Sequence, residues 1–316
     1  MKDHIQINAP ALPHQTDTIF LLDGGLETTL IFHDGVDLPY FAAFPLVETS
    51  EGRQSLRRYY SRYAAIAAEK GTGMILETPT WRASVDWAAL LGYDADRLAA
   101  ANIACVDMLR AMRDEIITPD APILLSGCIG PRGDGYAVGT AMTADEAATY
   151  HGAQIKALHQ GDVNMVTGLT MTYAEEAVGI ALAAEAAGVP AVISFTVETD
   201  GRLPSGQTLG DAIEHVDRET SMSPIYYMIN CAHPTHFEDA LNTGESWLHR
   251  IGGVRANASR LSHAELDEAE ELDDGNPVEF GEQHVQIRAM VPSVNVMGGC
   301  CGTDHRHVGQ VADCTC

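Results

Sequence analysis

Short apolar and β-branched runs recur along this chain with helix-like segments between them, and this alternation limits its fold more than any other feature. Eight such runs have the length and composition of β-strands. They are residues 19–23, 74–78, 123–127, 165–169, 191–197, 225–231, 253–257 and 293–297. Alanine-rich segments with helical periodicity lie between most of them, at 54–70, 96–117, 144–160, 173–187 and 277–290. This order is typical of parallel sheets covered by helices.

Eight strands of this kind favour a closed (β/α)8 barrel, the TIM-barrel fold of the α/β class. A chain of 316 residues suits one barrel with long loops. We expect a single domain over residues 1–316, with a core at about 19–308 and peripheral ends. Cys314 and Cys316 would then lie in a flexible tail, in preference to a redox pair or a cover over a metal. An open doubly wound sheet is the alternative that the same alternation permits.

Polar residues and cysteines stand at the ends of the predicted strands, where the loops of a barrel form its catalytic face. The residues at these positions include Asp23, Gly24, Gly25, Glu27, Glu77, Thr78 and Asn257. Cys231 ends the sixth strand, and Cys300 and Cys301 follow the eighth. These strands are two places apart in a closed barrel, so the three sulfur atoms can meet above its mouth. An open sheet does not guarantee such a meeting.

Three cysteines at one point indicate a metal site. The neighbours Cys300 and Cys301 cannot easily form a disulfide with each other, because their Cα atoms are about 3.8 Å apart and a disulfide prefers about 5.5 Å. Three soft ligands favour Zn2+ with an open fourth position. Zinc deprotonates a bound thiol, so the site predicts an enzyme that activates a thiol. The alternative is that the thiols are only small buried side chains.

The composition excludes several kinds of partner. The formal net charge of −25 argues against a nucleic-acid surface, which needs a basic stripe, and against an anionic membrane. No run approaches the roughly 18 apolar residues of a membrane span, and residues 1–6 lack the pattern of a secretory signal. We therefore expect a cytoplasmic protein that binds small molecules. A homo-oligomer is compatible with these features.

Four motifs make the chain resemble the zinc-dependent homocysteine S-methyltransferases. They are Asp-Gly-Gly-Leu-Glu at 23–27, Ser-Gly-Cys-Ile-Gly-Pro at 126–131, Ile-Asn-Cys at 229–231 and Gly-Gly-Cys-Cys-Gly-Thr at 298–303. The last two are the most specific, and the resemblance spans about residues 19–303. It implies a single barrel in which Cys231, Cys300 and Cys301 bind Zn2+ and a methyl group moves from a charged donor to the sulfur of homocysteine, giving methionine.

The resemblance and the strand-end positions together indicate the substrate contacts. They are Asp23, Gly24, Gly25, Glu27, Thr78, Thr170 and Asn257, with Tyr136 as a further pocket residue. The two glycines would let backbone amides approach a substrate carboxylate closely. The donor must carry a good leaving group, such as a sulfonium or a quaternary ammonium. Within the family, the length of the chain favours S-methylmethionine or S-adenosylmethionine over betaine or a folate and cobalamin system.

One position departs from the family pattern. Where the family has a Glu-Thr pair at the end of the fourth strand, this chain has Leu169 and Thr170. Leu169 cannot balance the ammonium group of homocysteine, a contact worth roughly 1.5–3 kcal/mol. Either a glutamate on a neighbouring loop compensates, with Glu27, Glu77 and Glu175 as candidates, or the acceptor is a different thiol. A non-catalytic zinc or thiol sensor is the alternative from another functional class.

Overall fold

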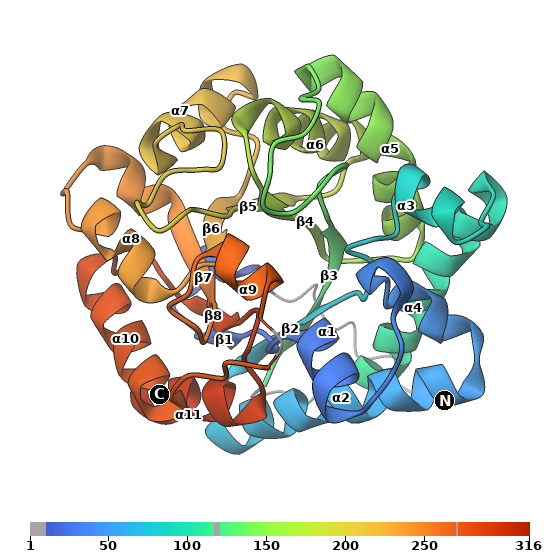
Figure 1. Cartoon of the computed structure of the whole chain (residues 1–316), viewed down its shortest axis with the longest axis horizontal. Coiled ribbons are helices and arrows are strands. Elements are labelled where there is room, and N and C mark those ends of the chain that lie inside the picture. The colour runs from blue at the N-terminus through green and yellow to red at the C-terminus, as the bar shows by residue number, and fades with distance from the viewer. Residues whose placement is uncertain (1–10, 117–120, 270) are drawn as a thin grey trace, which may run out of the picture.

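The computed structural model describes residues 11–116, 121–269 and 271–316. Within these ranges, eight parallel strands pair in chain order and β8 closes on β1, so the sheet is a barrel surrounded by helices (Figure 1). The predicted (β/α)8 fold is confirmed, and the open-sheet alternative is wrong. Residues 1–6, which lack the pattern of a secretory signal, and residue 117, the predicted end of one helix, lie outside the described residues.

The strands agree with the predicted runs to within a few residues. They are β1 Phe20–Leu21, β2 Gly73–Glu77, β3 Ile123–Ile129, β4 Met165–Met171, β5 Ala191–Phe195, β6 Tyr226–Asn230, β7 Ile251–Ala256 and β8 Val296–Gly299. β8 begins later than predicted because residues 292–293 form a turn, in which the Ser293 hydroxyl donates to the Ile251 carbonyl. Every strand residue is buried, as expected for a parallel sheet that is covered on both faces.

Helices surround the barrel, and most of them connect one strand with the next. Those in the described ranges are α1 Leu26–Thr28, α2 Ser50–Lys70, α3 Val85–Leu90, α4 Ala95–Ile116, α5 Ala144–Gln160, α6 Ala174–Ala187, α7 Leu209–Glu219, α8 Pro234–Leu241, α9 His263–Asp267, α10 Pro277–Met290 and α11 His305–Thr315. The predicted helical segments correspond to α2, α4, α5, α6 and α10. Across the part of the chain that the structure describes, no helix is both long and apolar enough to cross a membrane.

Local signals at the helix ends explain where two of these helices begin and stop. The Thr143 hydroxyl accepts from the Glu146 amide, and the Glu146 carboxylate accepts from the Thr143 amide, which forms the predicted capping box of α5. Gly188 follows the last residue of α6 with a φ of +74°, a left-handed conformation that favours glycine. The chain therefore turns there and enters β5.

The C-terminal end of the chain is not the flexible tail that the sequence suggested. Residues 305–315 form α11, which packs against α10 and α2 (Figure 1). Its apolar side chains Val308, Val311 and Ala312 are fully buried. Cys314 and Cys316 are themselves exposed. The missed signal is the apolar spacing of i, i+3 and i+4, which is typical of a helix that packs on one face.

The barrel interior has an apolar layer and a polar layer. The apolar layer is a cluster of buried side chains from Phe20, Leu22, Ile75, Leu124, Met165, Val192, Tyr226, Met228 and Val296. Successive side chains of a strand point to opposite faces, so residues two positions further along point into the barrel again. In β2 to β6 these residues are Glu77, Ser126, Thr167, Ser194 and Asn230. The polar layer thus lies toward the C-terminal ends of the strands.

Candidate active site

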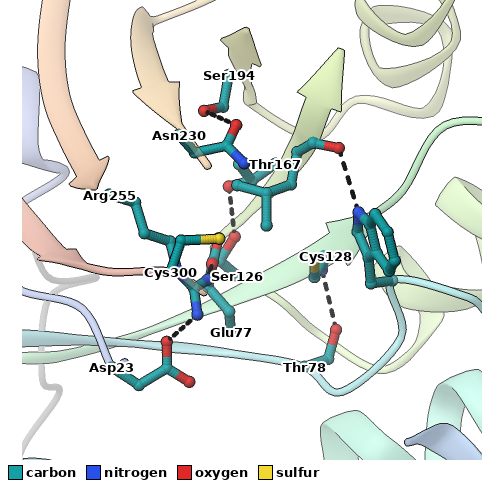
Figure 2. Close-up of polar contacts among 12 residues, drawn as sticks. Asp23, Glu77, Thr78, Ser126, Cys128, Thr167, Ser194, Asn230, Arg255 and Cys300 are labelled. Atoms are coloured by element: carbon teal, nitrogen blue, oxygen red, sulfur yellow. Dashed lines mark hydrogen bonds and ion pairs between the residues drawn. The ribbon is translucent and has the colours of Figure 1, made fainter. Parts of the chain in front are cut away.

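Hydrogen bonds between neighbouring strands order the polar layer of the interior (Figure 2). The hydroxyl oxygens of Ser126 and Thr167 are 2.7 Å apart and connect β3 with β4. The Ser194 hydroxyl donates to Asn230 Oδ1 at 2.6 Å and connects β5 with β6. These buried polar groups satisfy one another, as they must where water is excluded.

Arg255, on β7, extends across the barrel below the mouth. Its guanidinium forms ion pairs with Asp23 after β1 and with Glu77 at the end of β2, and its Nη2 lies 2.5 Å from the Asp23 carboxylate. It also donates to the Gly24 carbonyl at 2.8 Å and, through Nε, to the Gly299 carbonyl at 2.7 Å. The three charged side chains are buried. This triad of two carboxylates and one guanidinium connects β7 with β1, β2 and β8 (Figure 2).

Burial changes the acidity of Asp23. It raises the pKa of Asp23 to about 7, while the Arg255 charge lowers that pKa and the Glu77 charge raises it further. A single guanidinium balances two carboxylates here.

The three predicted metal-binding cysteines meet at the mouth, next to the triad. Their Sγ atoms all lie within 4.8 Å of one another. Cys231 and Cys300 form a disulfide, and Cys301 Sγ lies 4.0 Å from Cys231 Sγ. The geometric argument against a disulfide concerned the neighbours Cys300 and Cys301, and it did not predict a bond between Cys231 and Cys300. The closeness that suits a metal also permits that bond.

β7 lies between the strands that carry Cys231 and Cys300, and it holds the backbone of both residues. The Cys231 amide donates to the Arg255 carbonyl, and the Cys300 amide donates to the Ala256 carbonyl, so β7 supplies both backbone acceptors. Cys231 has a φ of +53°, which non-glycine residues rarely adopt. Such a conformation persists only where the surrounding structure holds it, and it is found most often at functional sites.

Asn230, the residue before Cys231, holds the end of β4. Its Oδ1 accepts from the Thr170 amide at 3.0 Å, and its Nδ2 donates to the Thr170 hydroxyl at 2.8 Å. Thr170 has a φ of +66° at an irregularity in the pairing of β4 with β5. Thr170 therefore lies at the mouth with its hydroxyl engaged by Asn230, and its contact with a substrate stays a prediction.

Two stacked aromatic rings lie beside the cysteines. The Tyr136 hydroxyl is 3.3 Å from Cys301 Sγ, and the Tyr136 ring stacks on His263 with the ring centroids 4.2 Å apart. His263 Nε2 lies 2.6 Å from the Cys231 carbonyl oxygen. Burial raises the pKa of the Cys301 thiol, and the Tyr136 hydroxyl opposes that shift. Tyr136 was expected in the pocket, whereas His263 carried no recognisable sequence signal.

The glycines after β1 pack against the turn at 300–303. A Cβ on Gly25 would lie 2.7 Å from the Cys300 carbonyl oxygen, so only glycine fits there without a shift of the backbone. The Gly25 amide lies 3.1 Å from both the carbonyl and the hydroxyl oxygen of Thr303. That amide is therefore engaged within the protein, and its approach to a substrate carboxylate stays a prediction. The corresponding role of Gly24 stays a prediction.

The remaining predicted contacts surround the same mouth. Glu27 lies half-buried in α1. The Thr78 hydroxyl, after β2, accepts from the Cys128 amide at 2.9 Å. Asn257, after β7, is buried and donates its amide to the Ala232 carbonyl, and no hydrogen-bond partner for its Oδ1 lies among the described residues. Asn257 thus keeps one buried acceptor that a polar ligand can use.

A model of the homocysteine S-methyltransferase family matches residues 20–315. The chain belongs to this family. It is therefore a methyltransferase of the kind that acts on homocysteine, and the alternative of a non-catalytic sensor is not supported.

The fold of this homocysteine S-methyltransferase family member is similar to that of the homocysteine methyltransferase MmuM from Escherichia coli. The oxidised form of MmuM superimposes with a TM-score of 0.76 and 18% identity, covering 96% of this chain and 98% of that chain. The metallated form gives a TM-score of 0.74 and 19% identity, covering 95% and 96%. At these identities the likeness establishes the shared barrel fold.

Two residues of the site, Arg255 and Asn230, were hard to recognise in the sequence. Arg255 lies within the run 253–257, where alternation indicated only a buried strand. A charged residue inside a buried strand is nevertheless a signal, because buried charges have to be paired. Asn230 was part of a motif without a role of its own, and only the structure shows it holding Thr170.

Proposed function

We propose that this protein methylates homocysteine to methionine, using Zn2+ held by Cys231, Cys300 and Cys301 and a sulfonium donor, S-methylmethionine. The observation that carries the proposal is the meeting of three cysteine sulfur atoms within 4.8 Å of one another at the C-terminal face of the barrel. Catalytic residues of such barrels come from this face.

The three sulfur atoms suit a tetrahedral zinc ion once the disulfide is reduced. Zinc–sulfur bonds of about 2.3 Å place two ligand sulfurs about 3.8 Å apart, which is close to the 4.0 Å between Cys231 and Cys301. Three protein ligands leave a fourth position for a substrate, as in catalytic rather than structural zinc sites. Thiolates are also the ligands that favour zinc over harder cations.

The proposed reaction is a direct displacement at a methyl carbon. When bound, zinc would keep the acceptor thiol deprotonated at neutral pH, where a free thiol with a pKa of about 8.5 is mostly protonated. The bond between the methyl carbon and the donor sulfonium sulfur breaks, and its electron pair stays on the departing thioether. The acceptor thiolate supplies the pair for the new bond. The protein residues contribute by holding the two substrates in line.

The aromatic pair supports a cationic donor. Tyr136 and His263 stack beside the cysteines, and the Tyr136 hydroxyl is already within 3.3 Å of Cys301 Sγ. Cations are attracted to the faces of aromatic rings. A sulfonium donor that approaches the acceptor sulfur would pass next to these rings, so we place the donor site on the side of the mouth formed by Tyr136.

Metal analysis and product detection test the proposal on the full-length protein, purified under reducing conditions. We expect about one zinc per chain and formation of methionine from homocysteine and S-methylmethionine. Cys300→Ser should lose zinc and at least about 100-fold in rate, whereas the exposed Cys314→Ser should keep both. A zinc-loaded protein that is inert with homocysteine and each of S-methylmethionine, S-adenosylmethionine and betaine would overturn the proposal. Methylation of another thiol alone would reassign the acceptor.

A further inference from the structure

Homocysteine, the acceptor in the proposed function, carries an α-ammonium group that the protein has to bind. The inference concerns this contact and rests on the proposed function. Moving a cation out of water is costly unless an anion pairs with it. Leu169, at the end of β4, has an apolar side chain, and its carbonyl accepts from the Trp81 indole at 3.4 Å. A carboxylate from another element has to balance the ammonium group.

Most carboxylates near the mouth already have a partner. The triad of Arg255 takes up two of them. Glu198, after β5, lies 3.4 Å from His263. Glu175, which the sequence offered as a substitute, lies 3.6 Å from His215 of α7, in the outer layer of helices. Each of these carboxylates is therefore already paired within the protein.

Glu27 differs from these carboxylates in both place and partners. It lies in α1, close to the turn at residues 300–303, which we call the cysteine turn. Gly25, just before α1, packs against the Cys300 carbonyl, and the Thr28 hydroxyl accepts from the Gly302 amide at 3.3 Å. The Glu27 side chain is half-buried. Glu27 forms no ion pair with a side chain of residues 11–116, 121–269 and 271–316, although the charges of Arg255 and Arg82 act on it.

The electrostatic surroundings of Glu27 suit a carboxylate that binds a cation. Burial raises its pKa, while its own backbone amide and the charges of Arg255 and Arg82 oppose that shift. A half-buried carboxylate that forms no ion pair with a side chain is stabilised by a ligand that supplies a cation at contact distance.

We propose that Glu27 binds the α-ammonium group of the acceptor and thereby determines the preference for homocysteine over thiols without an amino group. Only a short carbon chain separates the sulfur from the nitrogen in homocysteine. The ammonium partner must therefore stand next to the cysteines, and α1 meets this condition because it packs directly on the turn at 300–303.

Kinetics with two acceptors test the proposal in the zinc-loaded, full-length protein. Homocysteine is compared with 4-mercaptobutyrate, which is the same molecule without its amino group. Glu27→Gln keeps the size of the side chain and removes the charge. We expect the KM for homocysteine to rise about ten- to hundredfold, as for the loss of a charge-assisted contact, while the KM for 4-mercaptobutyrate stays within about twofold. Glu175→Gln is the matched control and should change neither value.

Calorimetric titration with each thiol, in the absence of a donor, gives a readout that does not depend on turnover. The wild-type protein should bind homocysteine more tightly than 4-mercaptobutyrate, and Glu27→Gln should abolish that preference. Unchanged discrimination, or equal weakening of both thiols, would overturn the role of Glu27. Intact discrimination in binding without any methyl transfer would instead count against the proposed function.

A rescue variant asks whether a carboxylate on β4 can replace that of Glu27. Leu169→Glu in the wild-type background supplies a carboxylate from β4, and adding Glu27→Gln to it should then leave homocysteine binding within about threefold of that of Leu169→Glu alone. A double variant that loses the preference for homocysteine despite the carboxylate introduced on β4 would show that a carboxylate at the mouth is not what recognises the ammonium group.

Discussion

At the scale of single residues, Arg255 has the largest influence on the order of the mouth. Its guanidinium contacts two carboxylates and two backbone carbonyls, which belong to segments far apart in the chain. A buried ion pair adds little stability compared with a well-packed apolar pair. Removing one partner is different, because it leaves a buried charge without compensation.

Replacement of Arg255 should therefore destabilise the fold strongly. We expect Arg255→Met to lower the free energy of unfolding by about 3–5 kcal/mol, since Asp23 and Glu77 would remain buried without a cation. Urea unfolding followed by circular dichroism measures this change. Arg97→Met removes an ion pair with Glu48 at the surface and should cost no more than about 1 kcal/mol. Equal losses in the two variants would contradict the structural role of the triad.

Asp23 should make the stability depend on pH. Its pKa of about 7 in the folded protein exceeds the value of about 3.9 for an unfolded chain. The folded state therefore binds the proton more tightly, and the stabilisation that it contributes is lost as the pH rises from about 4 to about 7. The free energy of unfolding of the wild type should fall across this window relative to that of Asp23→Asn. Unfolding curves at several pH values measure the difference, and the exposed Asp37→Asn should run parallel to the wild type.

At the scale of elements, α1 near the start of the chain and α11 at its end both support the cysteine turn. α1 packs on residues 300–303 through Gly25 and Thr28. α11 starts directly after this turn and is anchored between α10 and α2. α11 thus helps to hold the site in place, although the sequence predicted a peripheral segment there.

Weakening the packing of α11 should lower the stability of the whole barrel. Val311 is fully buried on this helix, and Val311→Ala should cost about 1–3 kcal/mol through lost burial and the cavity that remains. Cys314→Ala, on the exposed side of the same helix, should have almost no effect. Chemical denaturation of both variants distinguishes an anchored helix from a flexible tail, because a tail would tolerate both changes equally.

At the scale of the whole molecule, closure of the barrel creates the cysteine cluster. β6 and β8 are both neighbours of β7, so Cys231 and Cys300 approach each other although 69 residues separate them in the chain. A metal ion bound there would join two parts of the barrel. Binding to the folded state alone stabilises a protein, by about 2.7 kcal/mol at a hundredfold excess over Kd.

Zinc should accordingly raise the melting temperature of the reduced protein in a concentration-dependent way. Oxidation to the Cys231–Cys300 disulfide uses two of the three ligands, so it should abolish this shift, and a reductant should restore it. Scanning calorimetry with reduced and oxidised samples, together with Cys300→Ser, measures the effect. An equal zinc-dependent shift in the oxidised sample would show that the stabilising ion is bound elsewhere.

Local patterns in the sequence were sufficient for the architecture. The alternation of strands and helices depends on side-chain periodicity and on capping residues such as Thr143 and Gly188, which act over a few residues. The position of the cysteines at strand ends follows from the same patterns. Together with barrel closure, these local rules predicted that Cys231, Cys300 and Cys301 meet.

Only the tertiary structure decided which polar groups are engaged and which are left for a ligand. Arg255 pairs with Asp23 and Glu77, and Thr303 accepts from the Gly25 amide, whereas Glu27 forms no ion pair with a side chain among the described residues. These pairings join segments that are up to 278 residues apart, and no local pattern encodes them. They depend on distance and burial, which exist only after the barrel has closed.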